Sequence, residues 1–403
     1  MTFSIKNILI FFLLMLPLAN FPQLFNLGED LGSIYISIFI FIIFCFWVMS
    51  DGNIKLPTRK VNKILLSIIM IGIFLDIIAI ITSTVPIQEG ILVLLTFSLP
   101  KLLFLYLIII IAERISLNQA SHIINIFAFL MILSVLISPL FYPLNPIPEF
   151  IFYDGGTRFA GFHFELVNFS FSILIGFFIF SLRYKFSILF LLLVLIFLYF
   201  LASSNAFYPF ALLCIFGALI GKFRLKLTSR FFIVGILLLT PIIGLFLDYF
   251  EFLEIFALRE TTSFSLEGSA LFIRLYPWAL AMEHFIGNFL SLPIGLGMLN
   301  LSPFIEDKSN LFGGTGITAI IAEYGFLSVP IFYFFYQYFR LIAQNILQIP
   351  DANSRICLMA ILTLCITYIC IQSGFFNLTA WCLCIIVQTI SIKIFSEKNK
   401  YNP

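Results

Sequence analysis

Residues 64–84 read ILLSIIMIGIFLDIIAIITST, an apolar run with a single charged side chain, Asp76, and runs of this kind decide the fold. A helix needs about 20 consecutive apolar residues to cross the hydrocarbon core of a bilayer. Of the 403 residues, 62% are hydrophobic and 10% are charged, whereas soluble domains have about 45–50% apolar and about 25% charged residues. The composition therefore indicates an all-α, polytopic membrane protein, with residues 1–403 forming a single integral membrane domain.

Twelve such runs are predicted to be transmembrane helices, and an even number places both termini on the same side. The first run lacks a small-residue cleavage site, so it is interpreted as a span rather than a signal peptide. The predicted spans are residues 5–24, 31–49, 64–84, 91–111, 122–142, 165–182, 186–203, 206–221, 231–247, 315–338, 356–374 and 379–395.

The distribution of Lys and Arg predicts the orientation, because short basic loops resist translocation. With the N-terminus inside, seventeen of these residues fall on the cytoplasmic side, and Lys101 lies within a span. The outer side keeps only Arg158, Arg259, Arg274 and Lys308. A net charge of +2 is too small and too scattered to indicate a nucleic-acid partner.

Two predicted outer loops interrupt the apolar pattern, at residues 143–164 and 248–314. The first is rich in Pro, Gly and aromatic residues. The second forms most of residues 267–325, the longest polar interruption of the chain, and contains the turns PIGLG and FGGTG. Long loops in compact proteins are usually functional, so we expect these two to form the active site.

Arg158 and Arg274 are the outer bases best suited to chemistry, because a planar guanidinium can bind phosphate oxygens through paired hydrogen bonds. Each could instead pair with a nearby acid or with lipid headgroups. On a helix, Trp278 would lie one turn after Arg274 on the same face, and His284 about 80° around from Arg274. Pro277 either starts or kinks that helix.

Two intramembrane charges, Asp76 and Lys101, are costly and need a partner or a wet cavity. Either the two form a structural ion pair, or Lys101 lines an outward-open cavity and helps to hold an anionic substrate. The candidates for a general base on the outer side are a small set of imidazoles and carboxylates, each of which could also be a packed, hydrogen-bonded residue. They are His163, Glu165, Glu283, His284 and Glu323.

Several other patterns predict structure rather than chemistry. All seven cysteines lie in apolar runs, so packing is expected rather than disulfides or metal binding. Gly217 and Gly221 form a GxxxG pattern, which is typical of close helix packing. No P-loop, HExxH, GxSxG or CxxC motif is present.

The order and placement of these motifs resemble the bacterial O-antigen and capsule repeat-unit polymerases (Wzy-type), which share a superfamily with the O-antigen ligases. The resemblance covers the whole chain in architecture. Its local motifs are Arg158-x-x-Gly161, Arg274-x-x-x-Trp278-Ala279, Pro293-Ile294-Gly295-Leu296-Gly297 and Ala322-Glu323-Tyr324-Gly325.

The resemblance implies a multi-pass glycosyltransferase of the bacterial inner membrane, with both termini cytoplasmic, that joins undecaprenyl-pyrophosphate-linked oligosaccharide units on the outer face. It implies no cofactor and no metal, and as partners the lipid-linked donor and acceptor, a chain-length regulator and a flippase. Arg158 and Arg274 would bind the pyrophosphate. Lys101, Trp278 and Glu323 would support substrate binding, and the base would be His284, with His163 and Glu165 as the next candidates.

Two other functions remain open. The first is an O-antigen ligase, which passes finished glycan to a lipid core; ligases typically carry a His shortly before the late span, where this chain reads Phe312-Gly313-Gly314-Thr315. The second is a twelve-span transporter or flippase of lipid-linked sugars. Transporters commonly show internal repeats, and none is evident in this sequence.

Overall fold

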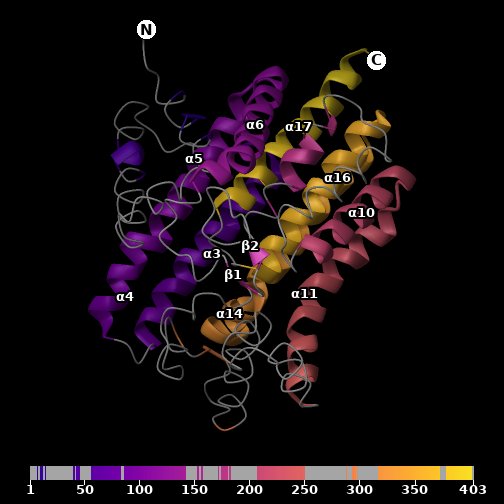
Figure 1. Ribbon diagram of the computed structural model, residues 1–403. Helices are drawn as coiled ribbons and strands as arrows, with labels where there is room; N and C mark the ends of the chain where they lie inside the picture. The colour runs from indigo at the N-terminus through magenta and orange to yellow at the C-terminus, as the bar shows by residue number, and fades with distance from the viewer. Residues whose placement is uncertain are drawn as a thin grey trace.

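The computed structural model is a bundle of helices (Figure 1). It describes residues 56–82, 86–141, 152–153, 156–157, 207–249, 316–372 and 378–401, with shorter pieces at 7–14, 40–45, 171–182, 287 and 293–297 that are described in part. The described elements are α3 (Lys60–Thr82), α4 (Ile87–Val93), the π-helix η3 (Leu94–Ser98), α5 (Leu99–Arg114), α6 (Leu117–Phe141), β1 (Phe152–Tyr153), β2 (Gly156–Thr157), α10 (Phe207–Phe223), α11 (Lys226–Tyr249), α14 (Gly316–Tyr324), the 3₁₀ helix η9 (Gly325–Ser328), α15 (Val329–Leu347), α16 (Ala352–Thr367), the π-helix η10 (Tyr368–Gln372) and α17 (Leu378–Tyr401).

Helices with defined bounds occupy eight of the twelve predicted runs. Of the other four, residues 165–182 are described in part and are helical there, residues 5–24 and 31–49 lie largely outside the described residues, and residues 186–203 lie wholly outside them. Within the described part of the chain, three helical stretches are long and apolar enough to cross a membrane: Lys60–Thr82, Ile320–Leu347 and Ala352–Cys370. These stretches indicate a membrane protein, while the number of spans stays a prediction. The two strands form a small antiparallel hairpin, with Phe152 opposite Thr157, inside the loop of residues 143–164.

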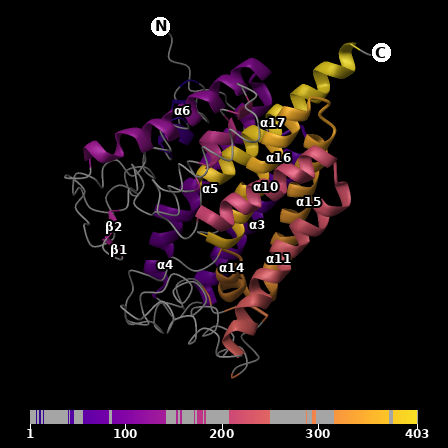
Figure 2. The same ribbon diagram turned by 45° about the vertical axis from the view of Figure 1, so that its right-hand side comes forward.

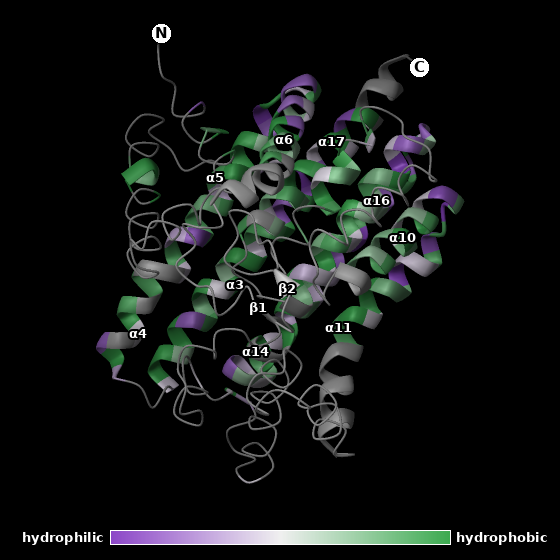
Figure 3. Cartoon of the chain, viewed as in Figure 1, coloured by the Kyte–Doolittle hydropathy of each residue, from purple (hydrophilic) through white to green (hydrophobic). Residues whose placement is uncertain are grey.

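The helices pack side by side with their apolar surfaces together. Figure 3 shows mainly hydrophobic residues along α3, α5 and α16, and hydrophilic residues at the upper ends of α6, α10 and α16. In Figures 1 and 2, α10 lies beside α16 in both views. The polar residues are therefore concentrated at the ends of these helices, as expected for helices that cross an apolar layer.

Close approach of α10 to α16 depends on the GxxxG glycines. A methyl group added to Gly217 would lie 2.8 Å from Thr363 Cβ, and one added to Gly221 would lie 2.8 Å from Arg355 O. Both distances are shorter than van der Waals contact, so the two backbones can approach this closely only because neither residue has a side chain. The packing role predicted for this pattern is confirmed.

Arg355 links α10 and α16 at one end through hydrogen bonds. Arg355 is 5% exposed, and its guanidinium donates to the carbonyl oxygens of Gly221 at 2.6 Å, Ile349 at 2.7 Å and Pro350 at 3.2 Å. The last carbonyls of a helix have no partner within the helix. Arg355 thus satisfies a free carbonyl near the end of α10 and ties it to the start of α16.

A carboxylate plays the corresponding role where α5 ends beside the start of α3. Glu113 Oε1 accepts hydrogen bonds from the backbone N–H of Thr58 and of Arg59, both at 3.0 Å, and from Asn62 Nδ2 at 2.8 Å. Partial burial alone raises the pKa of the Glu113 carboxyl, but the hydrogen bonds from Arg59, Asn62 and Thr58 outweigh it and hold this pKa below its usual value of 4.5. Gln388 Nε2 of α17 donates to Asn62 Oδ1 and extends the network to a third helix.

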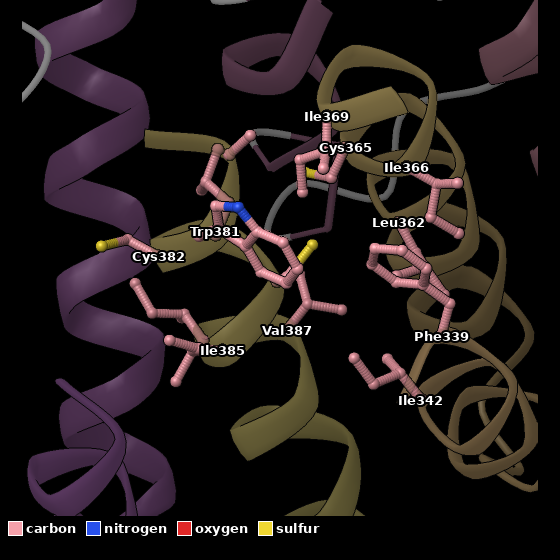
Figure 4. Close-up of a cluster of buried hydrophobic side chains, with 14 of the residues drawn as sticks. Phe339, Ile342, Leu362, Cys365, Ile366, Ile369, Trp381, Cys382, Ile385 and Val387 are labelled. Atoms are coloured by element: carbon pink, nitrogen blue, oxygen red, sulfur yellow. The ribbon is translucent and has the colours of Figure 1, made fainter. Parts of the chain in front are cut away.

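The core between α15, α16 and α17 is built around Trp381, which is 1% exposed (Figure 4). Its ring stacks on Phe339, with centroids 5.9 Å apart, and packs at a tilt on Phe335 and Tyr338. Six cysteines are buried, Cys45 is half-buried, and all seven are free thiols. This confirms that the cysteines pack as apolar side chains.

Candidate functional site

The late helix is broken at Gly325, and the break creates the candidate site. Gly325 has φ of 56°, in the left-handed region where a glycine ends a helix without steric cost. α14 therefore stops at Tyr324, η9 follows for four residues, and α15 begins at Val329 with Pro330 in its first turn, where proline is tolerated. The last carbonyls of α14 and an N–H of η9 are left to find partners outside the helix.

A turn from the loop of residues 248–314 supplies those partners. We call it the docking turn and define it as residues 293–295 and 297. Gly297 N donates to Glu323 O at 3.0 Å, and Leu327 N donates to Pro293 O at 3.3 Å. Two motifs that were singled out separately in the sequence, PIGLG and AEYG, are thus joined by backbone hydrogen bonds.

Gly295 is required where the docking turn meets the break. Its φ is 77°, again left-handed, and a methyl group built on it would lie 2.6 Å from Gly325 N and 2.5 Å from Glu323 C. Any side chain would press against the backbone of α14 and η9, which cannot move aside as a flexible side chain can. The glycine therefore lets the two segments approach to hydrogen-bonding distance.

A buried polar group lies beside this junction. The Tyr324 hydroxyl donates a hydrogen bond to Asp76 Oδ1 of α3, and the side chain of Ser98, at the end of η3, bonds to the same carboxyl group. Asp76 is fully buried and Tyr324 is 4% exposed. Asp76 Oδ2 has no hydrogen-bond partner within the part of the chain that the structure describes. Polar groups this deeply buried in spanning helices are costly and usually serve a function.

Two predicted site residues, Lys101 and Glu323, belong to the same neighbourhood. Glu323 is half-buried in the last turn of α14, and its carboxyl group is close enough to interact with the Tyr324 hydroxyl and with the charge of Asp76. Lys101 is half-buried in the first turn of α5, three residues after Ser98. The hydrogen bonds of Asp76 with Tyr324 and Ser98 link α3 to α14 and to η3.

Both π-helices adjoin this neighbourhood. Ser98 is the last residue of η3, and η10 packs against α14. A π-helix leaves the regular hydrogen-bond ladder and is found frequently at functional sites. The break at Gly325, the π-helix that ends at Ser98 and the π-helix packed on α14 are thus three irregular pieces of backbone in this part of the bundle.

The remaining predicted site residues lie outside the described residues. They are Arg158, His163, Glu165, Arg274, Trp278, Glu283 and His284. The structure does describe Thr157, the residue before Arg158, as the last residue of β2. Among the described residues, no group of three or more His, Cys, Asp or Glu side chains is arranged to hold a metal ion.

Two participants had no role in the sequence-based prediction, namely Tyr324 and Ser98. Tyr324 was part of the motif 322–325 without an assigned function, and Ser98 precedes the Leu99-Pro100-Lys101 segment. The sequence did indicate that Asp76 needs hydrogen-bond donors nearby, because burying a carboxyl group without them is costly. It did not indicate which residues supply those donors.

These features define a class of protein: a helical membrane protein with a broken late helix, a docking turn on the break and a buried polar group beside it. Comparison with protein-family models, with curated proteins and with solved structures finds no match to this chain.

Proposed function

We propose that the chain is a polysaccharide polymerase of the bacterial inner membrane that joins undecaprenyl-pyrophosphate-linked oligosaccharide units on the outer face. The observation that supports this proposal best is the docking of Gly297 on Glu323 at 3.0 Å. It joins two of the motifs on which the resemblance to the repeat-unit polymerases rests. It also ties the long loop to the spanning helices beside Asp76 and Lys101.

The proposed orientation follows from charge. The start of α3, the end of α5 and the α10–α11 connection carry Arg59, Lys60, Arg114, Lys222 and Arg224. In Figure 1, the α10–α11 connection and the C-terminal end of α17 lie toward the same end of the bundle, opposite α14. With the basic end cytoplasmic, the C-terminal end of α17 is inside and the break at Gly325 faces the outer half of the membrane. The N-terminus would lie inside as well if the number of spans is even.

In this proposal the protein transfers a growing glycan from its pyrophosphate carrier to the end of a new lipid-linked unit. Arg158 and Arg274 stabilise the negative charge of the leaving pyrophosphate, as charged donors do in a site shielded from water. Lys101, Trp278 and Glu323 contribute to holding the substrates. His284, or in its place His163 or Glu165, removes the proton from the attacking sugar hydroxyl.

The test is the surface polysaccharide of a strain that lacks the gene. Loss of a polymerase leaves single repeat units on the lipid core, seen as one short band on a gel. A bare core with accumulated lipid-linked glycan would instead identify a ligase. Unchanged long glycan would refute both.

A second experiment examines Arg274 in the complemented strain. We expect Arg274→Ala to abolish long glycan while the protein inserts at the normal level. Arg259→Ala, in the same loop, is the matched control and should retain long glycan. Wild-type chain length in the Arg274→Ala strain would contradict the assigned role.

A further inference from the structure

We propose that Asp76 and Tyr324 are positioning residues that hold the docking turn in place for the transfer reaction. The inference has two halves. The kinetic half, an effect on the rate of polymerisation, rests on the proposed function. The structural half, an effect on docking of the turn, concerns only α3, α14 and the docking turn and can be measured without an activity assay.

The argument begins with α14, which cannot fix its own position. It has nine residues, and isolated helices shorter than about 12–15 residues are marginal in water. The left-handed Gly325 separates it from the long helix α15. The placement of α14 therefore depends on contacts with other elements.

The hydrogen bond from Tyr324 to Asp76 is such a contact. It joins residues 248 positions apart in the chain, and it ends on α3, a helix of 23 residues that also packs along α15. Both side chains are buried, so water cannot replace a lost partner, and a single defined geometry is favoured.

The effect reaches the docking turn through one residue. Glu323, whose carbonyl accepts the hydrogen bond from Gly297, directly precedes Tyr324. A rotation of α14 that follows loss of the Tyr324 hydroxyl moves that carbonyl away from Gly297. The other hydrogen bond, from Leu327 N to Pro293 O, attaches the turn to a residue on the other side of Gly325. It cannot by itself fix both ends of the turn.

The first experiment measures docking by disulfide trapping in full-length protein in lipid nanodiscs. Cysteines are introduced at Ile294 and Phe326, which are 41% and 60% exposed and neighbour the bonded residues Pro293 and Leu327. Cys45 is replaced by Ala because it is only half-buried, whereas the other native cysteines are buried. The rate of disulfide formation under mild oxidation, followed by counting free thiols after denaturation, reports how often the turn is docked.

We expect Tyr324→Phe and Asp76→Leu each to slow trapping about fivefold, the change expected from one net hydrogen bond. Asp76→Asn should restore the parent rate, because its amide oxygen still accepts from Tyr324. The double variant Tyr324→Phe with Asp76→Leu should be no slower than either single one. The control is Tyr338→Phe, the same change at a buried tyrosine whose hydroxyl has no hydrogen-bond partner among the described residues; it should trap at the parent rate.

The second experiment measures polymerisation of purified lipid-linked repeat units. We expect Tyr324→Phe to lower kcat about fivefold with KM unchanged, because an interaction that aligns the transition state is lost. Tyr338→Phe should leave both constants unchanged.

The two experiments separate the failures. An unchanged trapping rate in Tyr324→Phe overturns the inference whatever the activity, and slowed trapping with an unchanged kcat overturns its kinetic half. If Tyr324→Phe slows trapping but the wild-type protein itself never polymerises the repeat units, the proposed function is refuted and the structural half of the inference is supported.

Discussion

Replacing Gly295 with alanine tests the docking of the turn on the broken helix. Gly295 has φ of 77°, and an L-residue in the left-handed region costs about 1–2 kcal/mol. The new methyl group would also lie 2.6 Å from Gly325 N, and overpacking of this kind costs about 1–3 kcal/mol. The docked state should therefore lose about 2 kcal/mol or more relative to the undocked state.

The assay is hydrogen exchange of the Gly297 amide, which donates to Glu323 O in the docked state. A loss of about 2 kcal/mol corresponds to roughly 30-fold faster exchange, since about 1.4 kcal/mol is a factor of ten. Mass spectrometry of the peptide around residue 297 in nanodiscs measures this rate. Gly287→Ala is the control, because an added methyl group there meets nothing within 4 Å. Equal exchange in the Gly295→Ala and wild-type proteins would refute the docking argument.

Two further predictions concern the helical scaffold. Gly217→Ala should lower the unfolding midpoint in detergent, because its methyl group would press on Thr363 Cβ at 2.8 Å and overpacking costs about 1–3 kcal/mol; an unchanged midpoint relative to Gly287→Ala would contradict this. The Glu113 carboxyl has a folded-state pKa below 4.5. Its contribution to the free energy of unfolding is therefore present above pH 4.5 and is lost as the pH falls through the lowered pKa. Wild-type stability should therefore fall on acidification, and Glu113→Gln should show a shallower fall below pH 4.5 in the same unfolding assay.

The helices were predictable because a spanning helix is a local property of the sequence. Residues 64–84 are apolar whatever surrounds them, and α3 covers nearly all of them. The GxxxG pattern at Gly217 was likewise readable, since a small residue permits close packing on whichever helix adjoins it. What the pattern left open was the partner, which proved to be α16.

The break and its contacts were not predictable in the same way. Residues 315–338 were predicted as one span, and their apolar character gives no sign that Gly325 takes a left-handed conformation. That conformation is stabilised by the docking turn, about thirty residues earlier in the chain. Asp76 was paired with Lys101 in one of the two interpretations. In the structure its carboxyl group is hydrogen-bonded to Ser98 and to Tyr324, which lies 248 positions away.

A break in a spanning helix carries a cost, because backbone groups in a membrane must find partners. In this protein, Glu323 O and Leu327 N meet that requirement with Gly297 N and Pro293 O. The same groups could have been satisfied within a continuous helix. A sequence that instead places Gly325 at the break and Gly295 against it gains a fixed attachment between a long loop and the bundle, next to the buried Asp76. The arrangement is therefore better explained by the need to hold the loop at one depth than by the stability of the helix itself.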